Sequence, residues 1–193
     1  MLLVLLVMFL AAVAALLTGG HLTDLADNTL AGLHWLAAAA TGQVLGSLTG
    51  GIAYPVGLIG SALCIGVFLR LNLRRPGVAL LALGFACNAL VVALNGAMPV
   101  SLATLARAGI TGFAEDPRHE LADATTRLPW LGDVVPVALP GLGQAVSPGD
   151  VLIAAGAGLL LYAGMGGAGH IPVQPPPSWE DLEAEPAADH PAQ

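Results

Sequence analysis

Six residues that could bind or react with a ligand lie within or beside one long connection, residues 95–149. They are Asn88, Asn95, Arg127, Trp130, Asp133 and Asp150. Arginine presents a planar guanidinium that suits a phosphate or carboxylate group. Asp133 and Asp150 would form a carboxylate pair only if the fold brought them together, whereas Asp150 alone suits the positive end of a helix dipole.

Asn88 and Asn95 lie seven residues apart in an apolar segment, so a helix would place them on one face. Polar side chains inside a membrane usually point into the helix bundle and form hydrogen bonds there. We therefore expect Asn88 to bind a neighbouring helix. The alternative is a polar patch that lines a cavity open to the outside.

The segment Thr126–Asp133 places Arg127 and Asp133 on either side of the apolar sequence Leu-Pro-Trp-Leu-Gly. We expect it to dock on the helix ends, with the two opposite charges satisfied there and Trp130 at the membrane interface. The alternative is a lid over a pocket in which Arg127 binds an anionic headgroup or substrate. Residues 134–149 contain prolines that exclude an ordinary membrane helix, so we expect a surface or re-entrant path.

Neither a metal site nor a cofactor is expected. The five histidines are scattered, and no two have the i, i+4 spacing of a helical zinc site. The two cysteines, Cys64 and Cys87, lie in neighbouring apolar segments at different depths, and we interpret them as small packing residues.

The composition indicates a membrane protein. Charged residues make up 10% of the chain and hydrophobic residues 56%, which leaves too few charges to cover a soluble domain of 193 residues. The chain has six arginines, no lysine and a net charge of −7, which excludes the basic surface of a nucleic-acid-binding protein. A mainly disordered chain is excluded by the same hydrophobicity.

Five apolar segments predict an all-α integral membrane protein with five transmembrane helices in a membrane domain of residues 1–169. The predicted spans are residues 1–17, 30–48, 52–69, 78–94 and 151–165. A cleaved signal peptide is the alternative for the first span, although it lacks the positive start that such a peptide needs. An interfacial helix is the alternative for the second. The acidic, proline-rich tail, residues 170–193, is expected to be disordered.

The orientation follows from three arginines in a short loop, Arg70, Arg74 and Arg75, which should face the cytoplasm. With five spans, the N-terminus and residues 95–149 would then lie outside, as a long ordered extracytoplasmic loop. The tail would lie inside.

The order of several short motifs resembles a family of small bacterial multi-pass membrane proteins catalogued only as a domain of unknown function. The motifs are Asn95-Gly-Ala-Met-Pro-Val100, Arg127-Leu-Pro-Trp-Leu-Gly-Asp133, Ser147-Pro-Gly-Asp150, an Arg-Arg-Pro-Gly turn, and a Gly-Gly break followed by Leu25-Ala-Asp27. The resemblance covers about residues 1–166. It implies a membrane fold and no particular activity.

We therefore expect a non-enzymatic subunit or scaffold of the bacterial cytoplasmic membrane, in contact with the bilayer and with a membrane-protein partner or a second copy. This expectation rests on the lack of a recognisable nucleophile–base or metal pattern. The alternative is a protein that binds, transports or modifies a lipid or small solute in a pocket under the outer loop.

Overall fold

The computed structural model describes residues 2–49, 53–113 and 118–167, and these residues are mostly helical. The long helices are α1 (Leu2–Leu17), α3 (Leu33–Thr49), α4 (Ala53–Leu71), α5 (Val78–Asn95) and α7 (Pro148–Gly164). Each matches a predicted apolar segment to within one helical turn at both ends. The predicted disordered tail, residues 170–193, lies outside the described residues.

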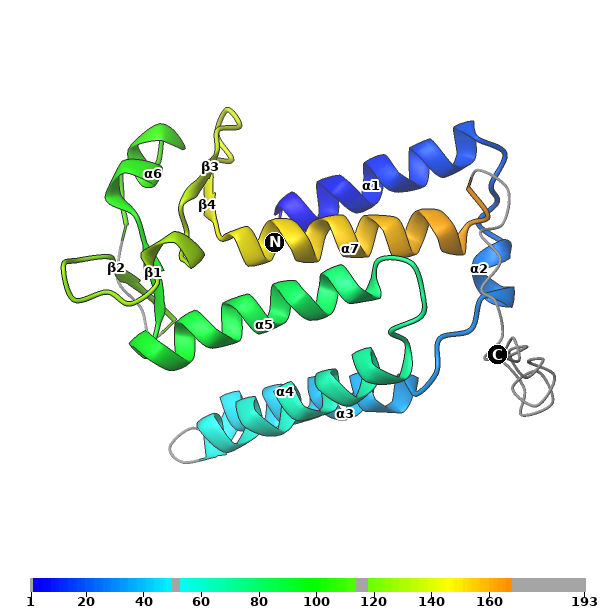
Figure 1. The fold of residues 1–193 in the computed structure, drawn as a ribbon, viewed down its shortest axis with the longest axis horizontal. Helices are drawn as coiled ribbons and strands as arrows, with labels where there is room; N and C mark the ends of the chain where they lie inside the picture. Colours follow the sequence, from blue (N-terminus) through cyan, green and yellow to red (C-terminus); the bar gives the residue numbers. More distant parts are fainter. Residues whose placement is uncertain (1, 50–52, 114–117, 168–193) are drawn as a thin grey trace, which may run out of the picture.

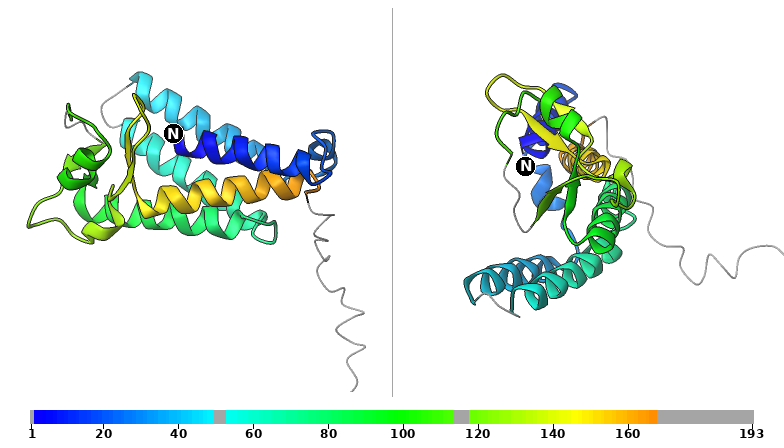
Figure 2. Two further views of the ribbon diagram at one scale, coloured as in Figure 1. Left: turned by 90° about the horizontal axis from the view of Figure 1, so that it is seen from above. Right: turned by 90° about the vertical axis from the view of Figure 1, so that its left-hand side faces the viewer.

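Successive long helices run in alternating directions, and in space they follow an open arc in the order α1, α7, α5, α4, α3 (Figures 1 and 2). Residues 18–32, which include the short helix α2 (Asp24–Asp27), lie at one end of the arc with the arginine turn between α4 and α5. Residues 96–113 and 118–147 lie at the other end. The predicted orientation likewise requires residues 18–29 and the arginine turn to lie at one end of the helices and the long connection after α5 to lie at the other.

By length and composition, one helix of the described residues can cross a membrane. This is α5, with 18 residues and a mean hydropathy of 2.1. The helices α1 and α7 and the Ile59–Leu71 part of α4 are apolar but shorter. That all five long helices cross a membrane thus remains a prediction.

Helices α5 and α7 approach each other through two facing pairs of glycines, which we call the glycine interface. Gly84 faces Gly149, and Gly77 faces Gly156, one heptad along each antiparallel helix. A methyl group on Gly84 would lie 2.5 Å from the Gly149 carbonyl oxygen, and one on Gly156 would lie 2.6 Å from the Gly77 carbonyl oxygen. Small residues let helix backbones come this close, which is a principal way in which membrane helices associate.

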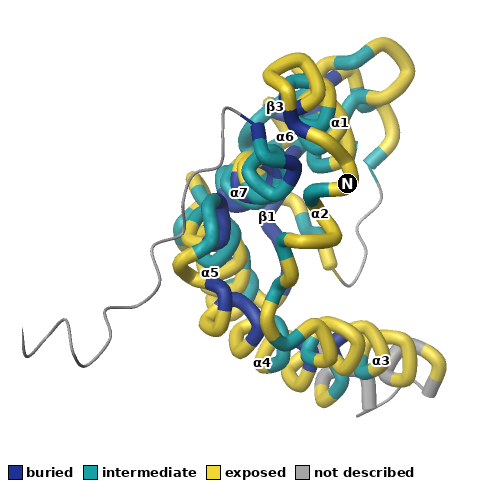
Figure 3. The backbone as a smooth tube through the Cα atoms, turned by 90° about the vertical axis from the view of Figure 1, so that its right-hand side faces the viewer, coloured by how far each residue is buried: buried dark blue, intermediate teal, exposed yellow. Residues whose placement is uncertain are grey.

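Helices α3 and α4 form a hairpin that joins the other helices mainly near the arginine turn. There Phe68, Leu69 and Val78 are buried together, with Trp35 and Leu81 packed against them. Elsewhere the hairpin presents many exposed residues (Figure 3). Gly42 and Gln43 of α3 meet Gly57 and Ser61 of α4, and the Gln43 side chain donates a 2.9 Å hydrogen bond to the Ser61 hydroxyl.

The connection between α5 and α7 includes short strands as well as helices, so the described residues are mostly helical and not all-α. It contains β1 (Met98–Val100), α6 (Leu102–Arg107), β2 (His119–Leu121), the 3₁₀ helix η1 (Pro129–Leu131), β3 (Val135–Val137) and β4 (Gln144–Val146). Strands β1 and β2 are parallel, with Met98 opposite His119, and β3 and β4 form an antiparallel pair, with Val135 opposite Val146. Most of residues 134–149 therefore form a β3–β4 hairpin beside α6, and Pro148 and Gly149 begin α7. The paired strands satisfy backbone groups that the prolines of this segment would leave unpaired in a helix.

The glycine interface predicts a strong difference between two equivalent substitutions. Gly84→Ala should destabilise the protein by about 1–3 kcal/mol, because the added methyl group meets backbone that cannot move aside alone. Gly66→Ala on α4 is the control, since no atom lies within 4 Å of the added group. It should be neutral or stabilise by up to about 1 kcal/mol through helix propensity. Thermal unfolding in one detergent measures both, and equal effects would contradict the close approach.

Candidate functional site

A ring of hydrogen bonds joins Asn88 of α5 to the start of α7. The Asn88 amide donates to an Asp150 carboxylate oxygen at 2.8 Å, and the Ser147 hydroxyl donates to the Asn88 carbonyl oxygen at 2.8 Å. Ser147 also caps α7 by accepting a hydrogen bond from the Asp150 backbone N–H, and the Asp150 carboxylate accepts one from the Ser147 N–H in return. This is a reciprocal capping box, extended by one residue from a second helix.

The ring gives the half-buried Asn88 side chain the interhelical contact that was expected of it. Its amide and carbonyl groups are both used, and its side chain lies against Gly149 of the glycine interface. Asp150 lies in the first turn of α7, where a negative charge is also favoured by the helix dipole. Ser147 was visible in the sequence only as part of the motif that opens α7.

Asn95 docks the segment Thr126–Asp133 onto the end of α5. Its side chain accepts a hydrogen bond from the Arg127 N–H at 2.8 Å and donates one to the Arg127 carbonyl oxygen at 2.9 Å. At the far end of the segment, the Asp133 N–H donates to the Pro99 carbonyl oxygen at 2.8 Å. Gly132 fits closely beside that carbonyl, where a side chain would clash. The segment is therefore held at both ends, mainly through its backbone.

The docked segment does not use the pair of charges that its sequence suggested. Among the described residues no ion pair joins Arg127 to Asp133, because Arg127 is exposed while Asp133 is buried, with 6% of its surface accessible. Trp130 is 63% exposed on η1. The turn into η1 depends on Leu128, which has a φ of 52°, an uncommon conformation for a residue other than glycine.

Asp133 is the candidate residue whose ionisation the fold alters most. Burial, followed by repulsion from the Asp150 carboxylate, raises its pKa from 3.8 to about 6, and attraction to His119 acts in the opposite direction. The backbone pairing with β1 places it there, since Asp133 forms a bridge to Val100. The structure thus brings Asp133 and Asp150 into electrostatic contact, which their sequence spacing alone did not require.

Further polar contacts hold the opposite end of the helices, where the predicted topology determinants lie. The buried Asn72 side chain accepts a hydrogen bond from the Ala31 N–H and donates to the Ala31 and Phe68 carbonyl oxygens, each at 2.8–2.9 Å. Arg75 donates to the Asn28 side chain and to the Thr29 carbonyl oxygen. Sequence reasoning assigned no role to Asn72 or Asn28, because their partners come from other segments.

Arg70 and Arg74 differ from Arg75 in being exposed. All three line one hollow beside the turn between α4 and α5. The arginine cluster therefore combines one structural residue with two that present their charge outward.

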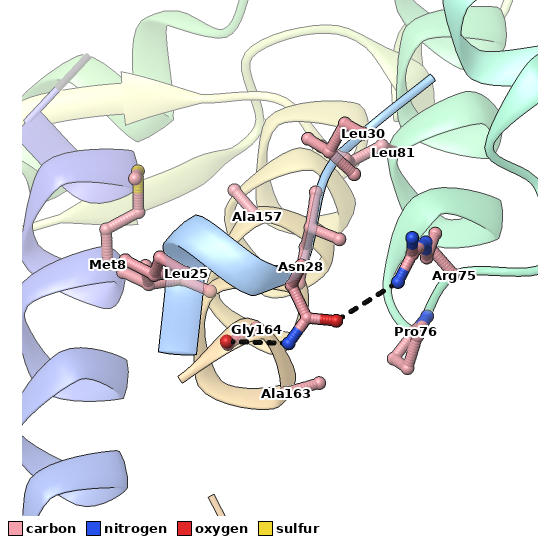
Figure 4. Close-up of a pocket in the computed structure, with 12 residues that line it drawn as sticks. Met8, Leu25, Asn28, Leu30, Arg75, Pro76, Leu81, Ala157, Ala163 and Gly164 are labelled. Carbon is pink, nitrogen blue, oxygen red and sulfur yellow. Dashed lines mark hydrogen bonds between the residues drawn. The ribbon is translucent and has the colours of Figure 1, made fainter. Parts of the chain in front are cut away.

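An apolar cavity of about 260 Å³ lies at this arginine-rich end (Figure 4). It is lined by side chains of α1, α2, α5 and α7, and Asn28 and Arg75 stand at its polar side. At the other end of the helices, the hollow beside Asn95 and Arg127 is mostly polar and has a volume of about 390 Å³. The apolar cavity thus lies at the end of the helices opposite to Asn95 and Arg127, whereas the ligand-binding alternative placed a pocket beside those residues.

Within the described residues, no group of three or more histidine, cysteine, aspartate or glutamate side chains is arranged to hold a metal ion. Cys64 and Cys87 are both free and half-buried. The arrangement around Asn88 and Asp133 provides hydrogen bonds between helices and one readily protonated carboxyl group.

One comparison with known proteins gave a match. The profile of the Family of unknown function (DUF5317) matches residues 35–162, from the start of α3 almost to the end of α7. No curated protein and no solved structure matched the chain.

Protonation of Asp133 should make the stability of the protein depend on pH. Because its pKa is higher in the folded state, the folded protein binds a proton between pH 4 and 6 that the unfolded chain has released, so stability falls as pH rises through that window. Each pKa unit corresponds to about 1.4 kcal/mol. Asp133→Asn should therefore stabilise the protein at pH 7.5 by up to about 3 kcal/mol, with little effect at pH 4.

Thermal unfolding of both proteins across pH 4–8 measures this difference. Asp123→Asn is the control, since it removes the same charge from a fully exposed carboxylate whose pKa is lowered by hydrogen bonds from Thr125. The control should show no gain at pH 7.5. If Asp133→Asn lowered the stability equally at every pH, the ionised Asp133 carboxylate would not be destabilised in the folded protein.

Proposed function

The chain belongs to the DUF5317 family of unknown function, and we propose that it is a multi-pass protein of the bacterial cytoplasmic membrane. In this proposal all five long helices cross the bilayer, with the N-terminus and residues 96–147 outside and the arginine turn inside. Its role is that of a non-enzymatic subunit or scaffold, which contacts a membrane-protein partner or a second copy.

The distribution of polar and apolar residues supports the membrane placement. Large apolar side chains are exposed along the helices: Leu5 and Phe9 on α1 are both 65% exposed, and Leu63 on α4 is 68% exposed. Contact of these surfaces with lipid tails costs no free energy, whereas their exposure to water is unfavourable. The polar connections gather at the two ends of the arc, where a bilayer would place its two interfaces (Figure 1).

A single observation carries the non-enzymatic role: the polar side chains near the helix ends serve to hold helices and loops. Asn88, Ser147 and Asp150 bind one another, and Asn95 binds the backbone of Arg127. Such groups are used in packing and are not available to activate a substrate. The proposal therefore assigns their chemistry to the fold.

The hairpin of α3 and α4 offers the surface for a protein partner. Val56, Ile59 and Leu63 lie on one face of α4 at spacings of three and four residues, and each is more than 60% exposed. Gly60 lies among them, and no atom lies within 4 Å of the position that a Cβ would occupy there. Another helix could therefore approach α4 closely at this point.

Cysteine labelling in intact cells tests the orientation. After Cys64 and Cys87 are replaced by serine, Ala124→Cys should react with an impermeant maleimide, because Ala124 is exposed on the outer loop. Thr23→Cys, exposed at the other end, should react only after lysis. The reverse pattern would invert the proposed topology, and labelling at both positions would refute the membrane placement.

Native mass spectrometry of protein extracted with its surrounding lipid tests the subunit role. We expect an assembly with a fixed number of protein chains that dissociates when Ile59 and Leu63 are both replaced by alanine. Replacement of Leu5 and Phe9 on α1 is the matched control and should leave the assembly intact. A single chain accompanied only by lipid in every preparation would contradict the proposed role.

A further inference from the structure

Two cavities of different character meet at Arg75. The first is the apolar cavity of about 260 Å³ (Figure 4), and the second is a hollow of about 600 Å³ that Arg70 and Arg74 also line. Arg75 and no other charged residue lines both. A ligand that occupied both would need an apolar part and an anionic part joined to each other.

The first cavity suits one hydrocarbon chain. Apart from Asn28 and Arg75, its lining is made of apolar side chains, proline and glycine, with Met8 from α1, Leu81 from α5 and Leu160 from α7. Its volume lies just below the range of about 300–1,000 Å³ found for pockets that enclose drug-sized ligands. It therefore fits a segment of chain better than a complete soluble molecule.

The second hollow suits an anionic headgroup. Arg70 and Arg74 are exposed there, and the Asn28 and Thr29 contacts use two of the five N–H donors of Arg75, which leaves three for a ligand within the described part of the chain. One guanidinium group can bind two phosphate oxygens at once through two charge-assisted hydrogen bonds. The hollow thus has the charge and the donors that a phosphodiester requires.

Hydrogen bonds fix this site before any ligand binds. The Asn28 side chain accepts from Arg75 at 3.2 Å and donates to the Gly164 carbonyl oxygen at 3.0 Å, so the α2 segment, the arginine turn and α7 are tied together (Figure 4). The Asn72 side chain fixes the backbone of Ala31 by accepting a hydrogen bond from its N–H and donating one to its carbonyl oxygen. A guanidinium held in place loses less conformational freedom on binding, which favours affinity.

We propose that this end of the protein binds one anionic phospholipid, with an acyl chain in the apolar cavity and the phosphate on Arg70, Arg74 and Arg75. The occupant follows from the juxtaposition of a chain-sized apolar cavity with three arginines at the ends of apolar helices. The inference rests on the proposed membrane placement, in which these arginines face the anionic cytoplasmic leaflet.

Lipid retention by the purified full-length protein tests the proposal. Phosphatidylglycerol or phosphatidylcholine is added to the protein in detergent, and native mass spectrometry counts the bound lipids. The wild type should retain one phosphatidylglycerol in preference to phosphatidylcholine. Arg70→Gln and Arg74→Gln should each weaken retention about fivefold, the equivalent of about 1 kcal/mol per arginine near an anionic lipid. Arg107→Gln removes the same charge at the other end and should have no effect.

A second pair of variants tests the apolar cavity. Ala157→Phe fills the cavity and should reduce retention of phosphatidylglycerol, whereas Ala155→Phe, on an exposed part of α7, should not. Equal retention of the two lipids, or equal loss in Arg107→Gln and Arg74→Gln, would overturn the proposal. Displacement of the lipid by excess inorganic phosphate would assign the site to a free anion instead.

This experiment is separate from the test of the membrane topology. Lipid is added in detergent, where the protein has no inside or outside, so an inverted topology does not change the result. Loss of the lipid preference with the labelling pattern intact would refute the lipid site alone.

Discussion

The close approach of α5 and α7 is the constraint on which the rest of the structure depends. Four glycines, in the pairs Gly84–Gly149 and Gly77–Gly156, bring the two backbones together without side chains between them. Because the pairs lie one heptad apart on antiparallel helices, they fix both the rotation and the register of α7 against α5. A shift of either helix by one residue would place a side chain where the other backbone lies.

This register determines the geometry of both ends. At one end it brings Asn88 to the capping box of α7, so that the first turn of α7 and the second half of α5 share hydrogen bonds. The 52 residues between α5 and α7 must then start and finish close together, as a closed loop. Strand pairing and the hydrogen bonds of Asn95 offset the conformational entropy that this closure costs. At the opposite end the same register places the arginine turn beside the end of α7, where Asn28 joins them.

The positions of the helices could be predicted from the sequence, but most of their contacts could not. An apolar run satisfies its own backbone as a helix, so its limits depend on local residues alone. Which of the 25 glycines face each other depends on how helices pair, and the sequence gives no register for that. Asn72 and Asn28 were missed for a related reason, since each binds groups that lie far away in the sequence: Asn72 binds the Ala31 backbone, and Asn28 binds Gly164 and Arg75. Arg127 and Asp133 were expected to share an environment because they bracket one segment, yet their backbone contacts place one side chain in the open and the other in the interior.

Solid-state NMR of the glycine-labelled protein in lipid bilayers tests the central claim most directly. With ¹³C at the glycine α-carbons and carbonyls, the close approach predicts cross-peaks between Gly84 and Gly149 and between Gly77 and Gly156. Gly66, which faces open space, should show no such interhelical peak. Absence of both pairs of cross-peaks, in spectra that resolve these four glycines, would contradict the glycine interface and the register that follows from it.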